Sequence, residues 1–272
     1  MTPQPVCVAA LLLCISFVQA QSVSTLMGAR SYAMADASSC LDDEWSLFNN
    51  PAGLSGIDNT MVSVGYALTP ALPGSDRMAV VGALPAWEGV LSAGIFRFGD
   101  TFYSEQILRL GYGHRLGLAA LGISVSLIQY SITGFGTRWV PGVTLGGVAE
   151  LTPWIKVGAY VANPNQPVVS RDQGERLPTR LTLGVAITAT ERVLAALEVE
   201  KDLEYEARWK MALEYRPLGR FHFRLGCGLV PQHFSIGVGF RSTRLRLDYA
   251  LDYSAFIGAG HQVTAGYPLR SQ

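Results

Sequence analysis

The chain has 272 residues, of which 49% are hydrophobic and only 15% are charged, and its formal net charge at neutral pH is zero. Soluble domains carry about 25% charged residues, so this composition is not that of a protein built chiefly for water. The balanced charge offers no electrostatic attraction to a polyanion, and we therefore exclude nucleic acid as a partner.

The first twenty residues have the pattern of an export signal. Residues 6–18 are apolar, and the triplet at residues 18–20 carries the small side chains after which signal peptidase cleaves. We expect residues 1–20 to be a cleaved signal peptide, so that the mature chain begins at Gln21. Beyond this signal, no apolar stretch reaches the roughly 18 residues that a membrane-spanning helix needs.

The cysteines give no disulfide framework. Cys7 and Cys14 would leave with the signal peptide, and only Cys40 and Cys227 remain. One bridge between them is possible, but spacing in the sequence does not place two sulfur atoms. Their pairing is left open at this point.

Residues 21–58 differ from the rest of the chain. Alanine, serine and aspartate are common in this segment, and an acidic run at residues 42–44 precedes Trp45, Leu47 and Phe48. The alternation that marks a strand is absent. We predict a short helical or irregular segment.

From residue 60 onward we count about fourteen strand-like windows, an even number as bacterial barrels require. In the clearest windows apolar residues alternate with small or charged ones, and every charge falls opposite the apolar face. These windows are residues 121–127, 180–187, 208–216, 234–241 and 245–252. A barrel wall needs one face for lipid and one for water, which this alternation supplies.

The same alternation also occurs in soluble sandwiches. The export signal, the 29 glycines and the low charge favour the barrel. Two early windows, residues 77–85 and 89–98, have apolar or small residues on both faces and leave the register of residues 60–110 undecided. A slip of one residue there would exchange the lipid and lumen faces. The predicted fold class is an all-β transmembrane antiparallel barrel of about fourteen strands.

Residues 28–37 and 42–54, which end in Asn50-Pro51-Ala52-Gly53-Leu54, resemble the N-terminal signature of the PorV/PorQ family in the FadL-like superfamily of outer-membrane transporters. Looser similarity continues at residues 177–184, 214–217, 247–251 and from 261 onward. The resemblance implies a short N-terminal helical hatch in the lumen, formed by residues 21–58, and a barrel formed by residues 59–272. The hatch residues that it singles out are Arg30, Asp42, Asp43, Asn50, Pro51 and Gly53.

Local geometry agrees with a turn at this motif. Pro51 restricts Asn50 to extended backbone, and Gly53 can adopt conformations that other residues resist. The segment can therefore turn sharply into the first strand.

The second half of the chain places many charges on the predicted lumen face. These are Glu198, Glu200, Arg208, Lys210, Glu214, Arg224, Arg246, Asp248 and Asp252. They could select solutes in a water-filled lumen, but opposite charges on successive strands favour pairing across the wall and with hatch charges such as Arg30, Asp42 and Asp43. Lumen residues of the first half are small, namely Ser63, Gly65, Gly122 and Ser124, which leaves room for the hatch.

Signs of catalysis are weak. His233 and Ser235 lie two apart on one strand face, which suggests nucleophile–base geometry, but no third group is identifiable. The glycines of residues 111–117 miss the dinucleotide fingerprint by one position, and neither a phosphate-binding loop nor paired-cysteine zinc spacing occurs. We predict no enzyme activity, no cofactor and no metal.

Two functions remain open. The FadL-like resemblance implies an outer-membrane protein that passes small hydrophobic molecules across the membrane of a Gram-negative-type bacterium. The alternative is a non-transporting PorV/PorQ-like barrel that binds protein partners or cargo in type IX secretion. Expected partners are outer-membrane lipid and either a small hydrophobic ligand or secretion-system proteins, and the irregular stretch of residues 163–176 is the favoured partner surface.

Overall fold

The computed structural model describes residues 24–134, 136–169, 176–203, 205–217 and 219–269. The predicted signal peptide, residues 1–20, lies outside the described residues. Residues 170–175 of the predicted partner loop lie outside them as well.

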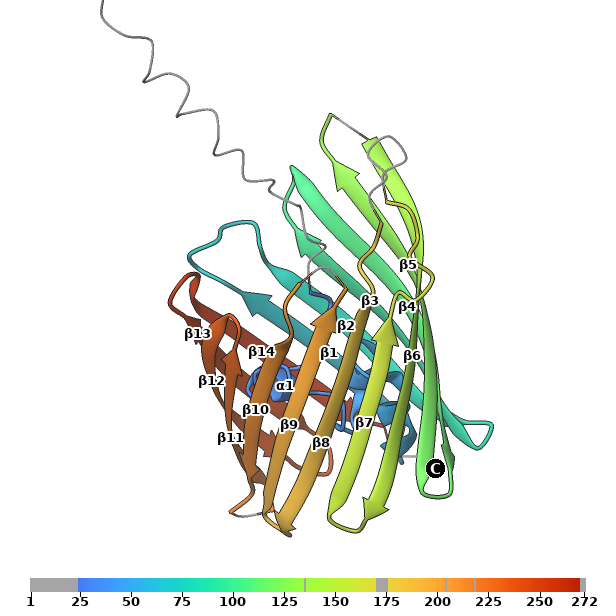
Figure 1. The fold of residues 1–272 in the computed structure, drawn as a ribbon, viewed down its shortest axis with the longest axis vertical. Helices are drawn as coiled ribbons and strands as arrows, with labels where there is room; N and C mark the ends of the chain where they lie inside the picture. Colours follow the sequence, from blue (N-terminus) through green and yellow to red (C-terminus); the bar gives the residue numbers. More distant parts are fainter. Residues whose placement is uncertain (1–23, 135, 170–175, 204, 218, 270–272) are drawn as a thin grey trace, which may run out of the picture.

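The described chain forms fourteen strands in one closed antiparallel barrel, in which each strand pairs with its neighbours along the chain and β1 closes onto β14 (Figure 1). The predicted fold class is thereby confirmed. The strands are β1 (Met61–Leu68), β2 (Arg77–Ala86), β3 (Gly89–Gly99), β4 (Tyr103–Leu116), β5 (Ala119–Ile132), β6 (Gly136–Thr152), β7 (Ile155–Ala162), β8 (Arg180–Thr190), β9 (Val193–Asp202), β10 (Arg208–Tyr215), β11 (Phe221–Leu229), β12 (Gln232–Arg241), β13 (Arg246–Ser254) and β14 (Gly258–Pro268).

Alternation along each strand separates the two faces of the wall. In β8, Leu181, Leu183 and Val185 are 36–47% exposed, whereas Thr182 between them is fully buried. The ambiguous window at residues 77–85 follows the same rule, because Val80 points outward while Val81 is buried inside. The outer wall is thus a band of apolar side chains that suits lipid.

The two ends of the barrel differ. At the lower end in Figure 1, two-residue turns such as residues 87–88, 117–118 and 191–192 join neighbouring strands. The two longest connections, residues 69–76 and 163–179, are both at the upper end. β6 has 17 residues and β10 has 8, so the wall is tallest around β4–β6.

Residues 24–60 fold into the lumen before β1 begins, and α1 lies inside the ring of strands (Figure 1). This segment, called the hatch below, contains the helix α1 (Ala29–Tyr32) and the 3-10 helices η1 (Glu44–Leu47) and η2 (Pro51–Gly56). Nearly all of its side chains from Thr25 to Leu54 are buried against the wall. No helix of the described residues is long and apolar enough to cross a membrane.

Candidate functional site: the lumen and its hatch

The largest charge network ties α1 to the wall. Arg30 donates from Nε to Glu214 Oε2 at 2.9 Å and from Nη2 to Glu214 Oε1 at 3.1 Å. Arg224 donates to the same carboxylate at 2.7 Å and to Asp248 at 2.6 Å. Arg30 also lies 3.5 Å from Asp43. Five of the predicted hatch and lumen charges thus meet in one buried network.

A second network holds the segment after α1. Lys210 of β10 pairs with Glu198 at 3.0 Å and with Glu200 at 2.9 Å. The other oxygen of Glu198 accepts from the backbone N–H groups of Ser38 and Ser39, at 2.9 and 2.8 Å. Hydrogen bonds to an ionised carboxylate that is shielded from water are stronger than those between neutral groups. The contact with Glu198 therefore fixes the hatch backbone at Ser38 and Ser39.

Two further charge contacts complete the attachment. Lys156 of β7 lies 2.5 Å from Asp42 and 3.0 Å from Glu150. On the other side of the hatch, Glu44 accepts from Ser63 at 2.7 Å and lies 3.5 Å from Arg246. In the described residues, these lumen charges therefore pair with hatch charges.

The Asn-Pro-Ala-Gly motif lies at the start of η2. Asn50 has extended backbone (φ −98°, ψ 108°), as predicted from the following proline. Its Nδ2 donates to Ser39 O at 2.6 Å and to Gly147 O at 3.2 Å, and its Oδ1 caps η2 at Ala52 N. The reason given for Gly53 was wrong, because its φ is not positive. A Cβ there would collide with Leu41 O and Ser46 Oγ, so the requirement is space.

Wall glycines let the hatch approach closely. A Cβ on Gly122 would meet the backbone of Pro51 and Ala52, and one on Gly65 would lie 2.8 Å from the Trp45 ring. In the second half of the wall, a Cβ on Gly226 would likewise meet the backbone of Met34 and Ala35. The predicted room for the hatch at Gly65 and Gly122 is present, and the hatch fills it.

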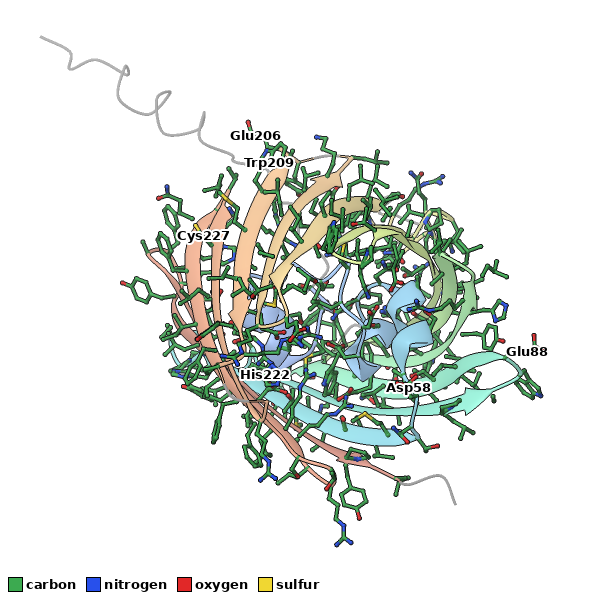
Figure 2. The ribbon with its side chains drawn as sticks, turned by 90° about the horizontal axis from the view of Figure 1, so that it is seen from below. Asp58, Glu88, Glu206, Trp209, His222 and Cys227 are labelled. Atoms are coloured by element: carbon green, nitrogen blue, oxygen red, sulfur yellow. The ribbon has the colours of Figure 1, made fainter. Side chains whose placement is uncertain are left out.

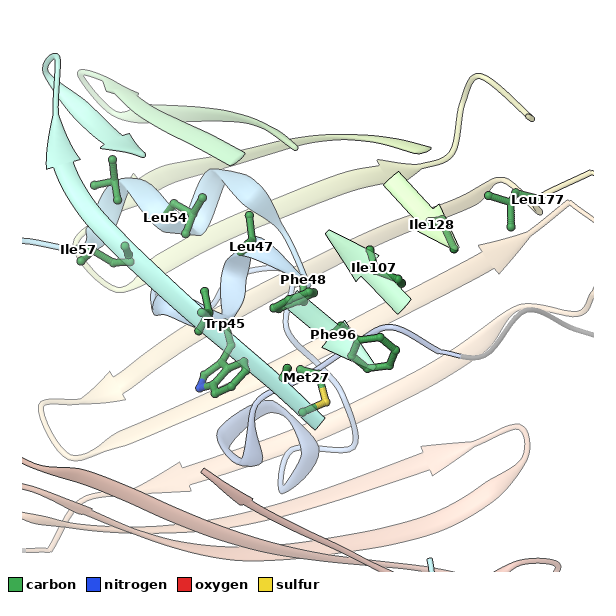
Figure 3. Close-up of a cluster of buried hydrophobic side chains, with 14 of the residues drawn as sticks. Met27, Trp45, Leu47, Phe48, Leu54, Ile57, Phe96, Ile107, Ile128 and Leu177 are labelled. Atoms are coloured by element: carbon green, nitrogen blue, oxygen red, sulfur yellow. The ribbon is translucent and has the colours of Figure 1, made fainter. Parts of the chain in front are cut away.

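The first half of the wall is not lined by small residues alone, which corrects the sequence analysis. Phe96, Ile107 and Ile128 are buried and face the hatch residues Leu47 and Phe48 (Figure 3). These side chains belong to one apolar cluster that runs along β2–β6, from Ala83 and Val90 near the lower end to Tyr130 and Val140 near the upper end, and also includes Leu177. We call this surface the apolar wall.

Glu105 and Arg109 of β4 were also missed, although their period-two spacing placed them on one face. Tyr103 donates to Glu105 at 2.6 Å. Arg109 is 6% exposed and donates to Ser126 at 2.7 Å and to Phe48 O at 3.2 Å.

A small pocket lies above the hatch, beside the apolar wall. Its lining is Thr25, Leu26, Phe48, Asn49, Arg109, Ile128, Thr144, Tyr160, Ala162, Asn163, Leu177 and Arg180. Two guanidinium groups and several hydroxyl and amide groups face it, but no carboxylate is among these lining residues. Its volume of about 20 Å³ is room for a water molecule rather than an aromatic ring.

The other predicted residues are placed as follows. Arg208 lies opposite Glu200 in the β9–β10 register. Ser235 donates to Asp252 at 2.5 Å, whereas His233 Nδ1 lies 3.0 Å from Pro231 O, so this pair shows no nucleophile–base contact. Within the described residues, no cluster of histidine, cysteine and carboxylate side chains could hold a metal ion.

Cys40 and Cys227, the two cysteines of the described residues, are free. Cys40 is buried in the lumen, where its Sγ contacts Gly184 O, whereas Cys227 lies in the barrel wall beside Met211 (Figure 2). The two side chains are on opposite faces of the barrel and cannot form a bridge.

No family model matches the chain, and no curated protein matches it. Several solved structures do match it in fold. The Ralstonia pickettii toluene transporter TbuX superposes with a TM-score of 0.71 at 12% identity, over 91% of this chain and 99% of that chain. The CymD monoaromatic hydrocarbon channel superposes with a TM-score of 0.72 at 12% identity, over 93% and 100% of the two chains.

The chain therefore shares the fold of these proteins, a closed antiparallel barrel, which its fourteen strands form. The toluene transporter TodX of P. putida agrees, with a TM-score of 0.71 at 14% identity over 92% of this chain and 100% of that chain. At such identities the likeness concerns the fold and not the ligand. The resemblance to the PorV/PorQ family stays a prediction.

Proposed function

We propose that this chain is an outer-membrane protein of a Gram-negative-type bacterium that passes small hydrophobic molecules, and that it is exported by a cleaved signal peptide. The apolar outer band supports the membrane location. Short periplasmic turns and longer outer loops are usual in such barrels, so the lower end of Figure 1 faces the periplasm.

The apolar wall is the observation that carries the transport proposal. It is a strip of apolar side chains that hatch residues such as Leu47, Phe48 and Leu54 now cover, whereas the opposite wall, β8–β13, is charged. An apolar solute would gain about 25 cal/mol for each Å² removed from water along this strip. The shared fold with the toluene transporters TbuX and TodX and with the monoaromatic hydrocarbon channel CymD adds support by analogy.

The pocket above the hatch is where the solute would be held. Phe48, Ile128 and Leu177 supply its apolar surface, and Arg109 and Arg180 supply donors for a ligand that carries an acceptor. Since the pocket now has room only for water, binding requires displacement of a covering segment. Thr25 and Leu26, near the start of the hatch, line the pocket. We expect this segment to be the one that moves when a ligand binds.

Ligand binding by the purified barrel tests this proposal. A fluorescent apolar probe, 1-aminoanthracene, is titrated into the protein and displaced with toluene or with octanoate. We expect saturable binding that weakens about tenfold in Ile128→Asn, because a polar group is then buried in an apolar site. Arg180→Gln should weaken only octanoate, whereas Arg176→Gln, an exposed arginine outside the pocket, should change nothing. Saturable binding that is indifferent to Ile128→Asn contradicts this site.

The firmly attached hatch favours a second candidate, the partner-binding barrel of type IX secretion. Three ion pairs, the hydrogen bonds of Glu198 to the hatch backbone and the close glycine contacts hold the hatch across the lumen. A lumen that the hatch closes in this way is compatible with a barrel that binds protein partners as well as with a channel. Purification from native membranes separates the two, because a stoichiometric protein partner on a barrel that binds no apolar probe would favour the second candidate.

A further inference from the structure

The lower end of the lumen carries a concentration of basic side chains on β11–β13 and just beyond β10. We call Arg216, His222, Arg224, Arg241 and Arg246 the basic cluster. Seen from the lower end in Figure 2, His222 lies on the inner side of the wall, next to the hatch. This cluster is separate from the pocket above the hatch, which shares no residue with it.

Strand register brings these residues together. His222 of β11 lies opposite Gly239 of β12, and Arg241 lies directly opposite Arg246 of β13. Gly239 has no side chain, and the Arg224 guanidinium and the Asp248 carboxylate occupy the space that a side chain there would fill. Two arginines directly opposite each other repel unless an anion lies beside them. Arg246 lies 3.5 Å from Glu44 of the hatch, whereas Arg241 forms no ion pair with a described carboxylate.

The nearby carboxylates are already engaged. Glu214 accepts two hydrogen bonds from Arg30 and one from Arg224, and Asp248 accepts one from Arg224. Arg216 Nε and His222 Nδ1 are each 3.9 Å from Glu214 Oε1, which is too far for a hydrogen bond. The nearest carboxylate therefore does not satisfy either group.

Several buried nitrogen atoms of the cluster have no hydrogen-bond partner among the described residues. They are Arg216 Nε, His222 Nδ1, Arg224 Nη2 and Arg241 Nε. His222 is 4% exposed and Arg224 is 1% exposed, so water does not readily satisfy them. A buried donor left without an acceptor costs about 1–3 kcal/mol, and more when it is charged. Three of these atoms are guanidinium nitrogens, which can only donate, so together they point to an acceptor.

The cluster is also accessible. The side chains of Arg216 and Arg246 are 35% and 31% exposed, so they reach the lower mouth of the barrel, while His222 and Arg224 lie deeper. Guanidinium groups present paired donors that match phosphate and carboxylate oxygens.

We propose that the basic cluster is a binding site for a phosphate-class oxyanion at the periplasmic mouth of the barrel. Arg241 and Arg216 bind the anion from the rim, and His222 and Arg224 donate from the floor. The phosphate group can belong to free inorganic phosphate or to the head group of an anionic lipid of the inner leaflet. The site does not depend on transport through the lumen.

Thermal unfolding of the purified barrel in uncharged detergent tests the proposal, with inorganic phosphate as the probe and chloride at equal ionic strength as the reference. We expect a saturable rise in Tm with phosphate, because a ligand that binds only the folded state stabilises it. Arg241→Gln should weaken the apparent affinity at least tenfold. Arg244→Gln, an exposed arginine in the neighbouring turn, is the matched control and should behave as wild type.

A second arm separates the two sources of phosphate. Barrels in nanodiscs of phosphatidylcholine are compared with barrels in nanodiscs that contain phosphatidylglycerol. A rise in Tm with phosphatidylglycerol alone, absent in Arg241→Gln, assigns the site to a lipid head group. If Arg241→Gln does not fold, Arg216→Gln, on the far side of the cluster, replaces it. No saturable effect from either source, or an equal effect in Arg244→Gln and Arg241→Gln, overturns the proposal.

Discussion

Glu214 of β10 receives both the Nε and the Nη2 hydrogen bonds of Arg30 in the hatch, although the two residues are 184 positions apart in the chain. Both side chains are nearly buried, with 1% and 12% exposure. Breaking one partner of a buried pair leaves an uncompensated charge and costs about 3–5 kcal/mol. We therefore expect Glu214→Gln to lower the free energy of unfolding by about that amount in equilibrium urea titrations.

The control for this substitution is Glu206→Gln, which removes an exposed carboxylate just before β10 (Figure 2). It should leave the urea midpoint unchanged. Equal midpoints for Glu214→Gln and wild type would mean that the contact between α1 and β10 does not hold the hatch.

Close approach of η2 to β5 gives a steric prediction. A Cβ on Gly122 would overlap the backbone at Pro51 and Ala52, so Gly122→Ala must push η2 away from the wall. Overpacking of this kind costs about 1–3 kcal/mol. Gly147→Ala is the matched control, because its nearest heavy atom would be 3.7 Å away. Urea unfolding should separate the two variants, and identical midpoints would argue against a seated hatch.

The outward face of β8 gives a prediction about the membrane. Leu183 lies near the middle of the strand and is 47% exposed. Leu183→Arg would place a charge in the lipid, which costs about 2–4 kcal/mol at the midplane of an outer-membrane barrel. Leu203→Arg, in the connection after β9, should cost little. Folding into phospholipid vesicles measures both, and tolerance of Leu183→Arg would show that this face does not meet lipid.

Asn50 links the hatch to itself and to β6, so its removal should loosen the segment around Cys40. In Asn50→Ala, the carbonyl groups of Ser39 and Gly147 lose their donor and η2 loses its cap. We expect a loss of about 1–2 kcal/mol and faster alkylation of Cys40, read by peptide mapping in a Cys227→Ser background. Asn59→Ala, an exposed asparagine before β1, should leave the Cys40 rate unchanged.

Much of the architecture was predictable from local pattern. Leu181, Leu183 and Val185 alternate with Arg180, Thr182 and Gly184, and a strand with one lipid face and one lumen face is the direct consequence of that period. The extended backbone of Asn50 was predictable for the same local reason, since a following proline excludes helical geometry. Charges such as Glu198, Lys210 and Glu214 could be assigned to the lumen, because lipid does not accept them.

Tertiary structure alone decided which of these residues meet. Glu214 could have paired with several arginines, and only barrel closure and the path of the hatch bring Arg30 to it. Gly53 and Gly122 are required for space that distant segments occupy, which no local pattern encodes. The sequence by itself therefore determined the wall, its two faces and the presence of a separate N-terminal segment. The folded chain decided the partners inside the lumen, because contacts between residues far apart in sequence depend on register and closure rather than on periodicity.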